Sequence, residues 1–289
     1  VVMRILSEKS RQYSLQSLGL NDENSEKVEE AYKKPHGMIL STGPTGSGKT
    51  TTLYAILKLL NQRSINIMTI EDPVEYDLTG INQIQVNNKT NLTFAAGLRS
   101  IVRQDPDVIL VGEIRDEETA SIAVNSAMTG HLVLSTLHTN DAATTLPRLI
   151  DMGVEPFLVA STVNVIVAQR LVRKIHAGCR VSIEKKVDDI TDLGAETIEK
   201  FSQGKDTIRL YEGKGCSVCH DTGYEGRIGV FEIMVMNDAI RDAIVAKKDA
   251  SEIRQIAIEH GMITMIDDGL EKVKQGITTI DEVLRVTKE

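Results

Sequence analysis

Between residues 37 and 140, the hydrophobic positions alternate between short apolar runs and longer segments in which apolar residues recur at helical spacing. The short runs predict strands, and the periodic segments predict amphipathic helices. In chain order these elements are a strand at 38–42, a helix at 49–61, a strand at 65–70, a helix at 93–104, a strand at 108–111, a helix at 117–128 and a strand at 132–137. Such alternation is typical of a largely parallel α/β sheet covered by helices on both faces.

The segments on either side of this region have a different pattern. A polar, charged stretch predicts a helix over 21–34. After the last strand, the pattern predicts helices at about 142–152 and 155–169, and then an irregular stretch over 174–230 that contains all three cysteines. From Asp238 onward, apolar residues return at helical spacing. The chain is therefore expected to end in a small helical bundle.

A glycine-rich motif, GPTGSGKT at 43–50, stands between a predicted strand and a predicted helix. It satisfies the pattern G-x-x-x-x-G-K-[ST] of the P-loop. In such a loop the glycines let backbone N–H groups face a polyphosphate, Lys49 neutralises the β and γ oxygens, and Thr50 ligates Mg²⁺. The alternative is an accidental glycine-rich turn. The residues expected to bind the nucleotide are Gly43, Pro44, Thr45, Gly46, Ser47, Gly48, Lys49, Thr50 and Thr51.

Hydrolysis of the nucleotide needs a carboxylate near the metal and a group that activates water. Glu113 follows the apolar strand 108–111 and is expected on the magnesium side, although Gly112 stands where an Asp is commonly found. Glu71 follows another strand, where parallel sheets present their ligand-facing residues, and is expected to be the general base. The alternative for each acid is a solvated charge in a loop.

Three arginines are candidates to stabilise charge on the transferred phosphoryl group, from this subunit or a neighbouring one. Arg99 and Arg103 have the i, i+4 spacing that places both on one helix face, and Arg115 follows the second acidic strand. For each of them, simple surface solubilisation is the alternative.

The cysteines have a spacing that suits a metal. Cys216 and Cys219 form a C-x-x-C pair, and His176 and Cys179 form a second pair at the same spacing. Three thiols and one imidazole can complete a tetrahedral zinc site. Free structural thiols or a metal-free relic are the alternatives, and His220 is a substitute ligand.

The composition narrows the classes of protein that fit. The 289 residues include 41% hydrophobic and 26% charged residues, which is typical of a globular protein and argues against disorder. The formal charge of −8 gives no electrostatic reason to expect nucleic acid or an anionic bilayer as the main partner. No apolar run reaches the roughly 18 residues that a membrane span needs. A soluble, cytoplasmic protein is expected, and the start of the sequence, which has no initiator, suggests a truncation.

Four segments together resemble the signature boxes of the secretion ATPase superfamily, of the type II secretion and type IV pilus assembly type. They are GPTGSGKT, TIEDPVEY at 69–76, RQDPDVILVGEIRD at 103–116 and TGHLVLSTLHTNDA at 129–142. In this family they are called the Walker A, Asp, Walker B and His boxes, and the glycine at position 112 is the usual form. The resemblance implies that Glu71 activates water and that Glu113 supports Mg²⁺. It also implies that His138, with His131 nearby, senses the γ-phosphate or couples it to domain motion.

The resemblance also implies a RecA-like P-loop ATPase core with a small cysteine-containing metal-binding subdomain and a helical C-terminal subdomain. In the assembly branch of the family the metal subdomain carries two C-x-x-C pairs, so His176 replaces a cysteine, whereas retraction motors lack this subdomain. Arg4 and Arg11 would belong to the tail of a preceding domain and lie near a phosphate. The expected divisions are 1–30 for that tail and its linker, 31–173 for the core, 174–230 for the metal subdomain and 231–289 for the helical subdomain.

The function implied by the resemblance is an ATP-hydrolysing motor for type IV pilus assembly or type II secretion, which uses ATP, Mg²⁺ and Zn²⁺ and releases ADP. Such a motor works as a ring, a hexamer, on the cytoplasmic face of the bacterial inner membrane. Its partners are a polytopic membrane platform protein and cytoplasmic domains of the same machine, and no nucleic acid is expected. The alternatives are a RecA-like nucleic-acid motor, a DNA-uptake ATPase of the same superfamily, and a nucleotide switch that does not hydrolyse.

Overall fold

The structure is a computed structural model that describes residues 14–190 and 193–287. Arg4 and Arg11 lie outside the described residues. The described residues form two compact units. The first unit contains the chain up to Gln169 and the segment Glu232–Met262, and the second contains Arg170–Phe231 and the chain from Ile263 onward.

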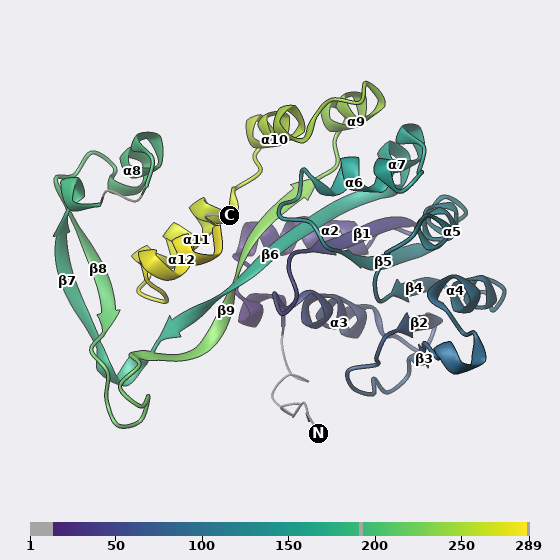
Figure 1. Ribbon diagram of the computed structural model, residues 1–289, viewed down its shortest axis with the longest axis horizontal. Helices are drawn as coiled ribbons and strands as arrows, with labels where there is room; N and C mark the ends of the chain where they lie inside the picture. Colours follow the sequence, from purple (N-terminus) through teal and green to yellow (C-terminus); the bar gives the residue numbers. More distant parts are fainter. Residues whose placement is uncertain (1–13, 191–192, 288–289) are drawn as a thin grey trace. The chain divides into compact units, whose positions relative to one another are not determined.

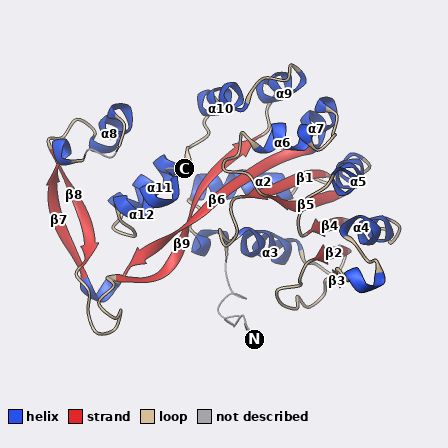
Figure 2. Cartoon of the chain, in the orientation of Figure 1, coloured by secondary structure: helices blue, strands red, loops and turns tan. Residues whose placement is uncertain are grey.

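A seven-stranded sheet has the order β3-β2-β4-β5-β1-β6-β9 (Figures 1 and 2). Its strands are β1 (Gly37–Thr42), β2 (Ile67–Glu71), β3 (Asn82–Gln85), β4 (Val108–Val111), β5 (Leu132–Leu137), β6 (Val163–Ile175) and β9 (Tyr224–Val235). All neighbours from β3 to β6 pair in parallel. The predicted α/β fold with a largely parallel sheet is therefore confirmed.

The helices of the first unit that precede β6 lie on both faces of this sheet. They are α1 (Leu15–Leu18), α2 (Asp22–Tyr32), α3 (Lys49–Leu60), α4 (Phe94–Val102), α5 (Glu117–Met128), α6 (Thr145–Asp151) and α7 (Pro156–Thr162), with a short 3₁₀ turn η2 (Asn88–Thr90). The chain moves from β1 to β2 in one direction along the sheet and from β3 through β4 to β5 in the other. Because crossovers are right-handed, α3 must cover one face and α4 and α5 the opposite face. The contacts agree, since α4 packs on α5 and α5 packs on α7 (Figure 1).

The central strands explain where the site lies. Every residue of β1, β4 and β5 is buried, as expected for strands covered on both faces. Because β1, β2, β4 and β5 are parallel, their carboxyl ends lie at one edge of the sheet. This edge receives the residues that follow each strand, and ligands of open α/β sheets bind there.

Two predictions about the middle of the chain are wrong. The helix expected at 155–169 ends at Thr162, and β6 follows it. Almost all of β6 up to Val172 is buried, and a strand buried on both faces has the same apolar content as a buried helix. The stretch 174–230 is also not irregular, since it contains most of the elements of the second unit. They are the turns η3 (Ala177–Cys179) and η4 (Val187–Asp189), the antiparallel strands β7 (Arg180–Lys186) and β8 (Thr207–Gly213), α8 (Ala195–Ser202) and the first part of β9.

The end of the chain is helical, as predicted, with α9 (Asp238–Val245), α10 (Ala250–Glu259), α11 (Met265–Lys274) and α12 (Ile280–Thr287). The first two helices belong to the first unit and the last two to the second. In the second unit, α11 and α12 pack against β8 and α8 around a buried apolar cluster. Among the described helices, none has the length and apolar character that crossing a bilayer would require. The residue boundaries predicted for the subdomains stay a prediction.

Candidate functional site

The glycine-rich loop connects the end of β1 to the start of α3. Gly43, Gly46 and Gly48 have φ angles of 144°, 80° and 95°, which residues with a Cβ rarely adopt. The helix begins at Lys49, and its N-cap is Gly48, which has no side chain to satisfy the first N–H groups. These donors, at the positive end of the helix dipole, suit a polyphosphate.

Two further residues hold this loop. Lys49 is buried, and its Nζ donates to the carbonyl oxygens of Gly43 at 2.8 Å and Pro44 at 3.1 Å. Gln169 of β6 donates from Nε2 to the carbonyl oxygen of Ser47 at 2.9 Å. The sequence does not predict a role for Gln169, because its apolar segment favours a helix. The sequence feature that could have indicated Gln169 is its place as a polar residue inside an apolar run.

Glu71 ends β2 and is only 2% exposed. Its Oε1 accepts hydrogen bonds from the Thr69 hydroxyl at 2.5 Å and the Gln83 amide at 3.2 Å, and its Oε2 accepts one from the Tyr54 hydroxyl. Burial, and then the hydrogen bond to Glu71, raise the pKa of Tyr54, so this phenol stays a donor. Glu71 is predictable from its place at a strand end. The three donors come from α3, β2 and β3 and left no sequence motif.

The close approach of two strands explains why position 112 is a glycine. A Cβ at this position would lie 3.2 Å from Cα of Glu71 and 3.3 Å from the carbonyl oxygen of Ile70. Both are backbone atoms of β2, which also accepts the hydrogen bond from the Gly112 N–H at 2.8 Å. The glycine therefore lets the strand that precedes Glu113 approach the strand that carries Glu71.

Glu113 lies between two cationic or titratable side chains. Its Oε1 is 2.5 Å from Nη2 of Arg115, and its Oε2 is 3.5 Å from Nε2 of His138. Burial lowers the pKa of His138, and the nearby charge of Lys49 acts in the same direction. Hence His138 is a neutral imidazole near pH 7, and it shares one edge of the sheet with the P-loop and Glu113.

Three predicted residues lie elsewhere. His131 precedes β5, whereas His138 follows it, so roughly 20 Å of strand separates them, and the expectation that they are neighbours is wrong. Arg99 pairs with Glu118 of α5. Arg103 is exposed at the end of α4, which returns the chain to the opposite edge of the sheet. A role for either arginine at the nucleotide of another subunit stays a prediction.

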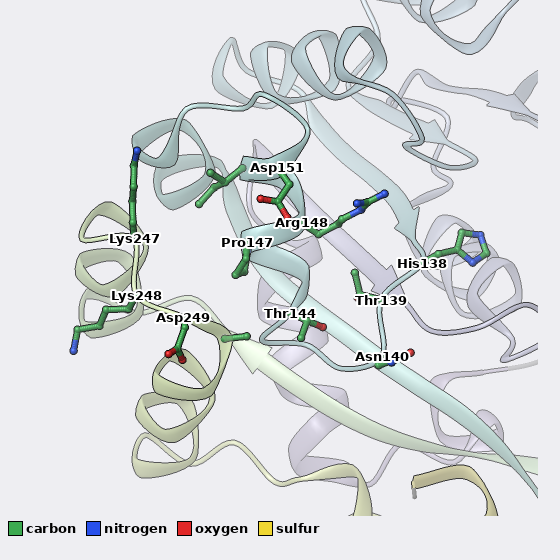
Figure 3. A pocket seen from close by; sticks show the side chains of 12 residues that line it. His138, Thr139, Asn140, Thr144, Pro147, Arg148, Asp151, Lys247, Lys248 and Asp249 are labelled. Atoms are coloured by element: carbon green, nitrogen blue, oxygen red, sulfur yellow. The ribbon is translucent and has the colours of Figure 1, made fainter. Parts of the chain in front are cut away.

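A cavity of about 620 Å³ opens beside His138, between α6 and the segment that joins α9 to α10 (Figure 3). Its cations are Arg148, Lys247 and Lys248. In Figure 3 the two lysine amino groups extend away from Arg148, and the ring of His138 turns away from both lysines. Lys248 lies 3.4 Å from Glu252 instead. The charged groups of the cavity therefore do not converge on one point.

The predicted metal ligands come together in the second unit. One ligand atom from each of His176, Cys179, Cys216 and Cys219 lies within 4.8 Å of the other three. His220, the alternative ligand, is exposed and is not part of this group among the described residues. Cys219 Sγ is 3.9 Å from the sulfur of Cys179 and 3.7 Å from that of Cys216. Zinc bonds of about 2.3 Å at tetrahedral angles require about 3.8 Å between sulfurs, so the donor set fits zinc.

Backbone N–H groups favour the thiolate form of Cys219. The N–H groups of Cys216 and Gly223 donate to Sγ of Cys219 at 3.2 and 3.3 Å. Burial raises the pKa of the Cys219 thiol, but these N–H groups and the neighbouring thiols outweigh it and lower this pKa to about 7. A thiolate is the form that binds metal.

Comparison with known proteins gives consistent matches. The chain is 48% identical over 289 residues to the type II secretion system protein E of Pseudomonas aeruginosa, which covers all of this chain and 56% of that protein. It is 49% identical over 288 residues to the type IV pilus assembly ATPase PilB of Thermus thermophilus, with all of this chain and 32% of that protein covered. A crystal structure of the pilus retraction motor PilT with bound ADP has a TM-score of 0.68 at 31% identity, over 96% of this chain and 67% of that one.

The chain spans about half or less of the length of these two curated relatives. The family described as "Type II/IV secretion system protein" matches residues 1–285, which include the P-loop, the acidic strand ends and the cysteine cluster. The chain therefore belongs to the type II/IV secretion system protein family.

Proposed function

We propose that this chain is the nucleotide-hydrolysing part of a motor that uses ATP to power type IV pilus assembly or type II secretion. The observation that carries the proposal is the meeting of the P-loop, Glu71, Glu113 and His138 at one edge of the parallel sheet. The names of the relatives support both processes, and the bound ADP of the retraction motor supports the nucleotide.

Each residue has a role in this proposal. Lys49 and the loop N–H groups bind the phosphates, and Thr50, the first residue after Lys49 in α3, ligates Mg²⁺. Glu113 would support the metal, and Glu71 would accept the proton of the attacking water. The neutral His138 lies 3.5 Å from Glu113, so it can register a change in the charge of that carboxylate.

The proposal includes a homo-oligomeric ring, a hexamer, on the cytoplasmic face of the inner membrane. In a ring, Arg99, which pairs with Glu118, and Arg103, which is exposed at the end of α4, can reach the nucleotide of a neighbour. The partners are a polytopic inner-membrane platform protein and cytoplasmic domains of the machine. The cysteine cluster favours the assembly and export branch over the retraction branch, and DNA uptake within the same superfamily is the second candidate.

Phosphate release from Mg·ATP by the purified protein tests this function. We expect ADP and phosphate in equal amounts, no release when Mg²⁺ is chelated, and no stimulation by DNA, because the net charge of −8 disfavours a polyanion. Stimulation by DNA would support the nucleic-acid motor instead. Tight nucleotide binding without release by the assembled ring would support the switch that does not hydrolyse.

We also propose that the His176 and cysteine cluster binds Zn²⁺ and closes the loop between β8 and β9 onto the turn after β6. Three thiolates and one imidazole are a common zinc ligand set. Metal analysis of protein purified without chelators is expected to find about one equivalent of zinc per chain. Less than about half an equivalent would contradict the assignment.

A further inference from the structure

The imidazole of His176 presents a defined nitrogen to the sulfurs. Its Nδ1 lies 3.5 Å from Sγ of Cys216. With zinc bonds of about 2.3 Å to sulfur and about 2.0 Å to nitrogen, tetrahedral angles require about 3.5 Å between these atoms. Nδ1 therefore lies at the distance from the Cys216 sulfur that two ligands of one zinc ion require.

The other ring nitrogen faces a carboxylate. Nε2 of His176 lies 3.4 Å from Oε2 of Glu225, the second residue of β9. The His176 side chain is 10% exposed, whereas that of Glu225 is 70% exposed. A movement of a few tenths of an ångström by this exposed side chain makes the contact a hydrogen bond from Nε2–H to the carboxylate. The lone pair of Nδ1 is then free for a metal.

The backbone holds the ring in this orientation. The N–H of His176 donates to the carbonyl oxygen of Gly223 at 2.9 Å, which fixes the residue beside the start of β9. Gly178 leaves the space for the ring, since a Cβ at this position would lie 2.9 Å from Cε1 of His176. The ring is therefore set between the sulfurs on one side and Glu225 on the other.

We propose that Glu225 is the positioning residue of this metal site, and that it holds His176 in the tautomer that ligates zinc through Nδ1. The proposal rests on the proposed zinc site. The role of Glu225 also explains how a histidine can take the place of a fourth cysteine. The carboxylate supplies the negative charge that a thiolate would carry and that the neutral imidazole lacks. Ligating histidines commonly donate their second N–H to a carboxylate, and removing that partner weakens metal binding about 10- to 100-fold.

The test compares zinc affinities of the whole protein by competition with a chromophoric chelator. Glu225→Ala is expected to bind zinc about 10- to 100-fold more weakly, with affinity partly restored in Glu225→Asp. Glu212→Ala, which removes an exposed carboxylate of β8, is the control for net charge and is expected to leave the affinity within about threefold. Equal affinities for Glu225→Ala and Glu212→Ala would overturn the proposal.

A second measurement needs no variant. The ¹⁵N chemical shifts of the His176 ring in the zinc-loaded wild-type protein are expected to show a metal on Nδ1 and a proton on Nε2. A metal on Nε2, with one zinc bound, overturns the role of Glu225 but leaves the zinc site. A wild-type protein without zinc overturns both, and phosphate release remains an independent test of the motor.

Discussion

Replacing Glu71 with glutamine is expected to lower kcat for ATP hydrolysis about 10²- to 10⁴-fold, because the amide cannot accept the proton of the attacking water. The affinity for Mg·ATP should change by less than about threefold, since the loop N–H groups and Lys49 bind the phosphates. The fold should tolerate the change. The glutamine oxygen can accept from Thr69 and Gln83, and its NH₂ can donate to the hydroxyl oxygen of Tyr54.

Steady-state phosphate release by the assembled ring, together with equilibrium binding of a nucleotide analogue, measures the two effects separately. Asp77→Asn is the matched control, because it removes an exposed carboxylate from the loop that follows β2 and should leave kcat unchanged. An assembled Glu71→Gln ring with the turnover of the wild-type protein would show that Glu71 is not the base. Its buried hydrogen bonds would then be only structural.

The hydrogen bonds of Glu71 fix the orientation of its carboxylate, as the role of a general base requires. An ionised carboxylate has about four acceptor positions, and Tyr54, Thr69 and Gln83 fill three of them. One position remains for a water molecule. The donors come from three different elements, so nucleotide binding at the start of α3, which carries Tyr54, is linked to the orientation of the carboxylate by a direct hydrogen bond.

The elements near the P-loop could be predicted from sequence for physical reasons. β1, β4 and β5 are short runs buried on both faces, and α3 begins at the glycine motif, so their ends agree with the prediction to within about one residue. β3 has the sequence Asn-Gln-Ile-Gln and half-exposed positions, which give no strand signal. β6 gives the opposite problem, because a continuous apolar run does not distinguish a strand from a helix.

Some residues of the candidate site could also be predicted from the sequence, and others could not. Glu71 and His138 directly follow apolar runs, Glu113 follows one after Gly112, and parallel pairing brings such positions to one edge. Tyr54 and Gln169 reach the site from the middle of a helix and of an unrecognised strand, so only tertiary structure shows their role. The error with His131 has the same origin, because residues close in a motif lie at opposite ends of a strand.

Changing Gly112 to aspartate is expected to lower kcat about 10- to 100-fold, even though it installs an acid where many P-loop enzymes carry one. The new Cβ would meet backbone atoms of Ile70 and Glu71 at 3.2 to 3.3 Å, and backbone cannot rotate away as a side chain can. Relief requires β2 and β4 to separate, which strains the hydrogen bond from the Gly112 N–H to Ile70 and displaces Glu71 from its donors. Such overpacking should also lower the free energy of unfolding by about 1–3 kcal/mol.

Phosphate release and urea unfolding of the same preparations measure both effects. Gly194→Asp is the matched control, because a Cβ at that exposed position has no atom within 4 Å and the residue has an ordinary φ of −64°. Gly112→Ala should fall between the wild-type protein and Gly112→Asp, since it adds the Cβ without the carboxylate. If Gly112→Asp instead raised kcat, the rate of hydrolysis would be limited by the number of acidic ligands at the metal rather than by the placement of Glu71. The glycine would then be a missing ligand, and the close approach of the two strands would have no part in hydrolysis.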